Sequence, residues 1–410
     1  MIIEQPYLTT DIPGIGGVYK KYLQDFHVEE IPLYDFCGHG EHLCFEIEKQ
    51  GLSTYAALAE LANALKVPRR SLGFAGLKDS QAVTRQWISL EHRKTAPLQR
   101  FRHPKMKILT VTRHTDKLKP GHLKGNRFRI RLREIKLPGA RALKRAQAIM
   151  EILINRGVPN YFGPQRFGVR HETPRMGLAL LRSDNESYMD LLLGYPKAED
   201  NRWSQKARRL YEQKRYLKAY HCWPASFSLQ RQALAALMRY HGDKSKACQA
   251  VDSMFKSLCI SAFQSDLFNR VLARRMPLID RLLPGDLACR HQDDTCFHVE
   301  EPDREQTRCD DFEISPTGPI WGYRMIEVSG PAGNYEHPVL AEAGIDKQDL
   351  ERVDRLHTKG GRRCLRFQPR DVNLRTGKDR QGFYLQLSFE LPSGCYATSL
   401  LREICKTSPS

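Results

Sequence analysis

The segment NRFRIRLRE, Asn126–Glu134, carries the sharpest local pattern in the chain. Phe128, Ile130 and Leu132 alternate with arginines, as they would in a β-strand with one apolar face. The pattern predicts a half-buried strand in a sheet. The other face of this strand would carry Arg127, Arg129, Arg131 and Arg133. This row of arginines is either a solvated surface or a surface that binds a polyanion. The second interpretation arises because neighbouring like charges repel each other.

Two helices are predicted on either side of this strand in the sequence. STYAALAELANALKVP places Leu58, Leu61 and Leu65 on one face, with Ser53 as the N-cap and Pro68 as the stop. ARALKRAQAIMEILINRG is amphipathic and ends at Gly157, a residue suited to a helix C-terminus. A strand, His42–Gly51, precedes the first helix.

The rest of the chain predicts strands at both ends and helices between them. We interpret Gly17–Tyr34 as a strand pair and Phe383–Phe389 as a strand followed by a short helix from Tyr396. The middle, up to about residue 260, is mostly helical and basic. We expect a loop at SPTGPIWGYRM, Ser315–Met325, because it is rich in Gly and Pro. The fold class expected is therefore α+β, with a helical insert between two β-rich parts.

The charge balance favours a polyanionic partner. The 410 residues include 65 Lys and Arg against 47 Asp and Glu, a formal net charge of +18. Nucleic acid is the leading candidate, and the arginine face of Asn126–Glu134 and the basic, aromatic segment Trp203–Tyr220 could both contact it. A membrane surface fits less well, since no basic amphipathic anchor and no apolar span is present.

The cysteines and the N-terminus predict a cytoplasmic protein. Eleven cysteines are scattered without a CxxC pair, which indicates reduced thiols rather than a disulfide framework. The N-terminal residues lack the features of a signal peptide. The segment CRHQDDTCFH, Cys289–His298, matches no common zinc spacing, so we interpret it as two short strands around a turn and expect no metal.

The segment GFAGLKDSQAVTRQW, Gly73–Trp87, places Asp79 on a turn between two strand-like stretches. Taken alone, such an acid is a common turn residue, because Asp bonds its own backbone there. Several other segments change this reading: LKGNRFRIRLRE, GVPNYFGPQRFG, AFQSDLFNRVL and LPSGCYATSLLRE. Together, from Lys20 to Glu403, they resemble the motifs of the TruD family of pseudouridine synthases, which act on uridine 13 of tRNA.

The resemblance implies a fold and a set of site residues. It implies a discontinuous catalytic domain, residues 1–156 and 368–410, built on a mixed sheet, with an inserted TRUD domain at residues 157–367. Asp79 matches the catalytic aspartate of the family. The substrate-binding residues implied are Phe26, Asn126, Tyr396 and Lys20, and Glu30 matches the acid that ends the Phe26 segment. Leu23 and Gln24 stand where the family often has Pro and Glu, and Tyr396 adds a hydroxyl to the ring.

The implied chemistry agrees with the motifs that the chain lacks. Pseudouridine is an isomer of uridine, so its formation needs no cofactor, metal or redox step, and the sequence contains no phosphate loop or dinucleotide fingerprint. One ionised acid suffices, either as a nucleophile or as the base that takes a sugar proton. The uridine must leave its stack to reach Asp79, and aromatic rings would hold it there. Asn126 could read the uracil edge or hold the Asp79 loop.

Two other classes of function, a non-catalytic RNA-binding protein and a nuclease, would share parts of this pattern. A non-catalytic RNA-binding protein or RNA chaperone on the same fold would use the same charge and rings, but it would not need Asp79. A metal-dependent nuclease would need several converging carboxylates, whereas the acids near the motifs are single. We therefore expect a monomeric tRNA-modifying enzyme.

Overall fold

A computed structural model describes residues 5–91, 96–352 and 359–407. The chain divides into two compact units. The unit named here the sheet unit consists of Tyr7–Asn160 and Phe367–Ser410, and the unit named the insert unit consists of Tyr161–Arg366 with Met1–Pro6.

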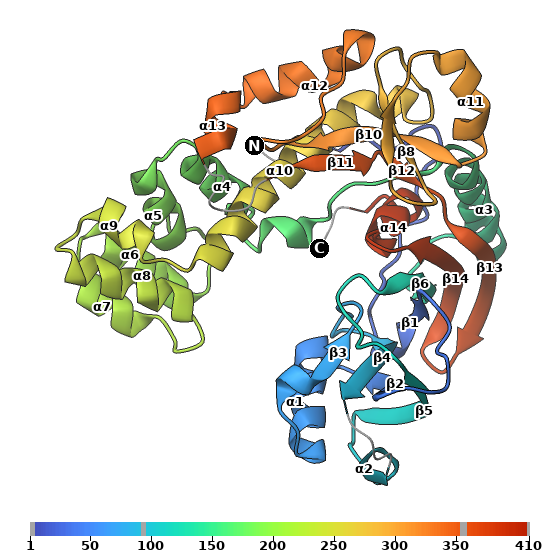
Figure 1. Cartoon of the computed structure of the whole chain (residues 1–410), viewed down its shortest axis with the longest axis horizontal. Coiled ribbons are helices and arrows are strands. Elements are labelled where there is room, and N and C mark those ends of the chain that lie inside the picture. Colours follow the sequence, from blue (N-terminus) through green and yellow to red (C-terminus); the bar gives the residue numbers. More distant parts are fainter. Residues whose placement is uncertain (1–4, 92–95, 353–358, 408–410) are drawn as a thin grey trace. The chain divides into compact units, whose positions relative to one another are not determined.

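The sheet unit is built on one eight-stranded mixed sheet, which confirms the α+β fold class (Figure 1). The order is β13-β14-β6-β1-β4-β2-β5, with β3 paired to β4. Strands β1 and β4 are parallel, and the other pairs are antiparallel. The strands are β1 Phe26–Pro32, β2 His42–Gln50, β3 Leu72–Phe74, β4 Val83–Glu91, β5 Met106–His114, β6 Leu123–Leu132, β13 Arg370–Asp379 and β14 Gly382–Pro392.

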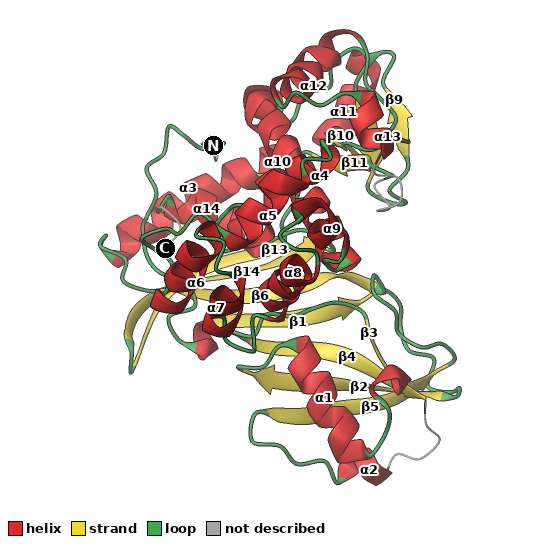
Figure 2. Ribbon diagram, turned by 90° about the vertical axis from the view of Figure 1, so that its left-hand side faces the viewer, coloured by secondary structure: helices red, strands yellow, loops and turns green. Residues whose placement is uncertain are grey.

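One face of this sheet is apolar and is covered by helices. Phe128 on β6 stands opposite Val28 on β1 and Phe389 on β14, so alternate residues of all three strands share a face. Helix α1, Thr54–Leu65, packs Leu58 and Leu61 against Phe45 on β2, and it lies along β4, β2 and β5 in Figure 2. Helices α3, Gly139–Arg156, and α14, Ala397–Cys405, pack together beside β13 and β14. A short helix, α2, spans Ala96–Gln99.

The opposite face carries the arginines of β6, and carboxylates from neighbouring strands pair with them. Arg127 lies 2.6 Å from Glu390 on β14, and Arg131 lies 3.0 Å from Asp379 on β13. Arg133 binds Asp25 through two hydrogen bonds of 2.7 Å and also contacts Asp379. These ion pairs support the reading of a solvated, charge-balanced face. Arg129 contacts His27 at 3.2 Å instead, so three of the four arginines in this row are paired with carboxylates.

Local signals predicted the two helices correctly. The Ser53 hydroxyl accepts a 3.2 Å hydrogen bond from the backbone N–H of Ala56, which caps α1. Helix α3 ends at Gly157, whose φ of 90° a residue with a side chain rarely adopts. Both of these helix ends lie at the residues that the capping signals indicate.

The insert unit combines a helical part with a small sheet. The apolar core of the helical part includes Tyr188, Trp223 and Leu237, and the long helix α10 packs against α4. The helices are α4 Thr173–Leu181, α5 Asn185–Leu193, α6 Arg202–Glu212, α7 Tyr216–Cys222, α8 Ser228–Arg239, α9 Lys244–Gln249, α10 Ser253–Arg275, α11 Pro302–Asp310, α12 Gly330–Glu342 and α13 Lys347–Arg352.

The strands outside the large sheet form two smaller sheets. The four-stranded sheet has the order β11-β10-β8-β9, and β7 pairs with β12 in a two-stranded sheet. The strands are β7 Val158–Pro159, β8 Leu287–Arg290, β9 Cys296–His298, β10 Ile314–Ile320, β11 Gly361–Cys364 and β12 Arg366–Phe367. In the described part of the chain, no helix combines the length and the apolar character needed to cross a membrane.

Two sequence predictions are wrong. Gly17–Tyr34 contains only one strand, β1, because Leu23–Asp25 forms a 3₁₀ turn before it and Val18 makes an isolated bridge to Arg133. Ser315–Met325 is a loop only in its second half, since Ile314–Ile320 forms the buried strand β10. Pro316 and Pro319 lie within that strand, although proline removes a ladder donor and is uncommon in a central strand.

Candidate active site

The loop that carries Asp79 is held to helix α1 and strand β4 through Thr54. This loop joins β3 to β4. The Thr54 hydroxyl accepts a 2.8 Å hydrogen bond from the backbone N–H of Lys78 and donates a 3.0 Å hydrogen bond to Gln86 on β4. Thr54 is buried, as is Gln86. The first residue of a capped helix therefore fixes the loop next to Asp79.

A second anchor is Lys49, a buried lysine at the end of β2. Its Nζ donates hydrogen bonds to the backbone oxygen of Leu52, at 2.6 Å, and to the backbone oxygen of Asp79, at 3.3 Å. Burial lowers the pKa of Lys49 to about 8, and the negative charge of Asp79 opposes this shift. Lys49 thus fixes the backbone of Asp79 and places a positive charge close to it.

The Asp79 carboxylate faces Lys20. Lys20 Nζ lies 3.1 Å from Asp79 Oδ2, and the Asp79 side chain keeps 41% of its surface exposed. Lys20 has a φ of 61°, a left-handed conformation that costs energy for a residue with a side chain. The Asp79 carboxylate is thus paired with one cation and is still exposed enough for a substrate to reach it.

The ring of Phe26 packs against Lys20. Lys20 Nζ lies 4.5 Å from the centroid of the Phe26 ring, within range of a cation–π contact. The ring is only 1% exposed and packs edge-on against Phe128, with centroids 6.2 Å apart. In this structure the ring therefore contacts Lys20 and the core, and it does not present an open surface.

Lys78 and Glu30 form a buried ion pair behind the loop. Lys78 Nζ lies 2.7 Å from Glu30 Oε2, and both side chains are almost completely buried. Glu30 Oε1 also accepts a 3.2 Å hydrogen bond from the backbone N–H of Trp87. Burial raises the pKa of Glu30, and the Lys78 charge acts against that rise. Lys78 therefore points into the sheet unit and pairs with Glu30, whereas the neighbouring Asp79 pairs with Lys20.

Asn126 lies directly opposite Glu30 in the pairing of β6 with β1. It shares the apolar phase of Phe128 and Ile130, so its side chain emerges on the helix-covered face. Among the described residues, no hydrogen-bond partner is found for its buried Oδ1. Buried polar atoms normally have a partner, so this oxygen is a candidate to accept a hydrogen bond from a substrate.

Tyr396 sits at the N-terminus of α14, 44% exposed. The turn before it is tied to β6, since Ser393 N–H donates a 3.1 Å hydrogen bond to the Lys124 oxygen and Leu391 pairs with Asn126. Lys20 thus contacts both Phe26 and Asp79. Asn126 lies on the neighbouring strand β6, and Tyr396 follows strand β14 of the same sheet.

Sequence reasoning missed Lys49 and Thr54. The signal for Lys49 was present, because Leu43, Phe45 and Ile47 alternate on the buried face of β2 and Lys49 continues their phase. A charged residue in an apolar phase is worth attention, as such a group needs a buried partner. Thr54 gave no comparable signal, since its neighbour Ser53 already accounts for the start of the helix.

The described residues offer no group of three or more His, Cys, Asp or Glu side chains that could hold a metal ion. Cys289 and Cys296 are cross-strand partners on β8 and β9, so the two strands predicted for Cys289–His298 are confirmed. The arrangement around Asp79 can instead hold one ionised carboxylate beside a cation and offer acceptors to a flat polar ring.

Comparison with known proteins shows the family to which the chain belongs. The family model described as tRNA pseudouridine synthase D (TruD) matches residues 2–404. The tRNA pseudouridine synthase D of Geotalea daltonii is 40% identical over 98% of this chain and 100% of its own length, and that of Thermus thermophilus is 34% identical over 98% and 92%. The solved structure of a putative TruD protein from Methanosarcina mazei is 26% identical, with a TM-score of 0.84 over 98% of this chain and 96% of that chain. The chain belongs to the tRNA pseudouridine synthase D family.

Proposed function

We propose that this enzyme isomerises uridine 13 of tRNA to pseudouridine and that Asp79 is its reacting acid. In the isomerisation the bond from ribose C1′ to uracil N1 breaks and a bond from C1′ to C5 forms, while C5 loses a proton and N1 gains one. Either role considered for Asp79, nucleophile or base toward the sugar, requires an ionised carboxylate. The observation that carries the proposal is the 3.1 Å pair between Lys20 and the half-exposed Asp79.

The surrounding residues fit supporting roles. Lys20 would keep Asp79 ionised when the substrate excludes water, because a nearby cation favours the charged form. Phe26 would hold Lys20 in place, and the exposed ring of Tyr396 would stack on the flipped uracil. The unpartnered Oδ1 of Asn126 would accept a hydrogen bond from the N3–H of uracil. These roles assign each candidate residue one physical task.

The proposal extends to the setting of the enzyme. We propose that the enzyme is a monomer and that it acts in the cytoplasm. The free thiols of all eleven cysteines support the cytoplasmic location. We also propose residues 1–156 and 368–410 as the catalytic domain and residues 157–367 as an inserted domain.

Pseudouridine mapping tests the substrate and the position. RNA from cells with and without this protein would be treated to mark pseudouridine and sequenced. The proposal predicts that the mark at position 13 of tRNA disappears when the protein is absent and returns with the wild-type gene but not with Asp79→Asn. Loss of the mark at other tRNA positions only would contradict the assignment of uridine 13.

A further inference from the structure

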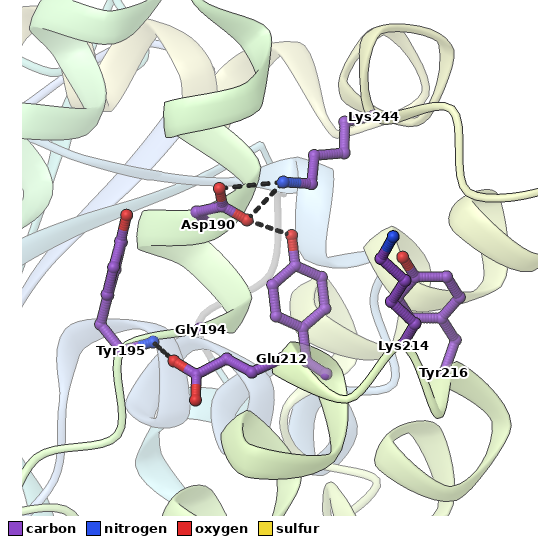
Figure 3. Close-up of a pocket in the computed structure, with 8 residues that line it drawn as sticks. Asp190, Gly194, Tyr195, Glu212, Lys214, Tyr216 and Lys244 are labelled. Atoms are coloured by element: carbon purple, nitrogen blue, oxygen red, sulfur yellow. Dashed lines mark hydrogen bonds and ion pairs between the residues drawn. The ribbon is translucent and has the colours of Figure 1, made fainter.

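A pocket of about 230 Å³ lies in the helical part of the insert unit (Figure 3). Residues of α5, α6, α7 and α9 and of the turns after α5 and α6 line it: Asp190, Gly194, Tyr195, Tyr211, Glu212, Lys214, Tyr216 and Lys244. Pockets for drug-sized ligands usually enclose about 300–1,000 Å³, so this one suits a single ring system. None of these residues belongs to the Asp79 site.

The floor of the pocket is fixed by Asp190. Its carboxylate accepts a 2.6 Å hydrogen bond from the Tyr211 hydroxyl and lies 2.8 Å from Lys244 Nζ. Burial and the Asp190 bond raise the pKa of Tyr211, which keeps its hydroxyl protonated as a donor. Asp190 is thereby neutralised and ordered before any ligand arrives.

The rim carries groups without partners. The Tyr195 side chain is 50% exposed, and its backbone N–H donates a 3.0 Å hydrogen bond to Glu212 Oε1. In the part of the chain that the structure describes, no partner is found for Glu212 Oε2 or for the Lys214 ammonium group. Figure 3 shows Tyr195 on one side of the pocket and Lys214 with Tyr216 on the other.

The backbone holds the two rim residues in uncommon conformations. Tyr195 has a φ of 52° and Lys214 a φ of 58°, values at which glycine is the favoured residue. Both residues follow the end of a helix, α5 or α6, where a left-handed residue is common.

The helices beside the pocket form a basic surface. Their exposed cations have no carboxylate partner within the described ranges: Arg202, Lys206, Arg209, Arg215 and Lys218. Trp203 on the same helix α6 is 64% exposed. Exposed rings among unpaired cations are typical of surfaces that bind single-stranded nucleic acid, where bases stack and phosphates meet Lys and Arg.

We propose that this pocket takes an unpaired nucleotide of the RNA substrate, with its base against Tyr195 and its phosphates on the cations of α6 and α7. Glu212 Oε2 can accept a hydrogen bond from an exocyclic amine or from a ring N–H of that base. The inference rests on the proposed function only in taking RNA as the ligand.

Equilibrium binding of a tRNA transcript tests the ring. Tyr195→Ala should weaken binding by at least about fivefold, the lower end of what stacking of one base contributes, while Tyr195→Phe should bind as wild type. Lys214→Gln should also weaken binding. Arg304→Gln is the control, because Arg304 is an exposed cation of the same unit on helix α11 and pairs with Glu301, the N-cap of that helix.

Equal affinities of Tyr195→Ala and wild type would overturn the inference, and so would equal weakening by Tyr195→Phe and Tyr195→Ala. If wild type forms no pseudouridine but Tyr195→Ala still weakens binding, the proposed reaction fails and this binding site stands. If wild type does not bind tRNA, the inference is overturned.

Discussion

At the scale of the residue, Lys49 is the group whose environment makes the clearest prediction. Its pKa is lowered from 10.5 to about 8 by burial, so the folded protein holds this proton less well than the unfolded chain does. The cost to folding is full below about pH 8 and is relieved as the pH rises toward 10.5. The contribution is at most roughly 3 kcal/mol, from 1.36 kcal/mol per pKa unit.

Comparing wild type with Lys49→Met isolates this effect. The difference in unfolding free energy between the two should increase in favour of wild type between about pH 8 and pH 10.5. Lys107→Met is the control, since Lys107 is an exposed lysine on the adjacent strand β5. A pH-independent difference, measured by denaturant unfolding, would show that Lys49 titrates normally.

The rings of Phe26 and Tyr396 should respond differently to truncation. Phe26 is buried, so Phe26→Ala should destabilise the fold by about 3–5 kcal/mol and slow turnover because Lys20 loses its support. Tyr396 is exposed, so Tyr396→Ala should leave stability unchanged and slow turnover by one to two orders of magnitude, as the loss of about 1–3 kcal/mol of stacking implies. Thermal melts and single-turnover rates measure both. If Tyr396→Phe were as slow as Tyr396→Ala, the hydroxyl and not the ring would be the working part.

At the scale of the element, helix α1 and the Asp79 loop are joined through the Thr54 hydroxyl. Thr54→Val keeps the shape and removes both hydrogen bonds, which should cost about 1–3 kcal/mol by leaving the Lys78 N–H and Gln86 without their partner. Turnover should fall further than stability alone explains, because Asp79 follows Lys78 directly. Thr54→Ser should restore both properties. A Thr54→Val variant with wild-type turnover would show that the loop is positioned without α1.

The same elements show what the sequence can and cannot reveal. The alternation in β6 and the caps of α1 and α3 are local signals, and the structure follows them. Strand β10 was missed because its two prolines argue against a central strand, and its burial between β11 and β8 prevails over that preference.

The roles of individual arginines and of Lys49 depend on register, which a single sequence does not show. The partners of Arg127 and Arg131 come from β14 and β13, more than two hundred positions away in the chain. The family resemblance alone implied Asp79 and Lys20 as site residues, and the structure places them in contact. Lys49 could have been found from its phase in β2, whereas Thr54 could not.

At the scale of the whole molecule, the cations behind the formal net charge of +18 differ in whether a carboxylate pairs with them. Arg127 and Arg131 of β6 pair with carboxylates. Among the described residues, no carboxylate partner is found for Lys206 and Arg209 of α6. Binding to RNA releases counterions, so the log–log salt slope shrinks by about 0.7–0.9 for each phosphate that the protein no longer neutralises. Lys206→Gln/Arg209→Gln should flatten this slope, and Arg129→Ala/Arg131→Ala, which removes the same charge, should not. Titrations of tRNA at several salt concentrations measure the slopes. A slope flattened by Arg129→Ala/Arg131→Ala and not by Lys206→Gln/Arg209→Gln would show that the β6 face, and not α6, contacts RNA.

The central claim is that this molecule is an enzyme whose reacting group is Asp79. The measurement that tests it most directly is single-turnover formation of pseudouridine in a tRNA transcript by purified wild type and Asp79→Asn, with tRNA affinity measured on the same samples and a chelator present throughout. The account predicts that wild type forms pseudouridine, that Asp79→Asn forms none, and that both bind tRNA with nearly equal affinity. Pseudouridine formation by Asp79→Asn at a rate near that of wild type would contradict it, as would binding of tRNA by wild type without any isomerisation.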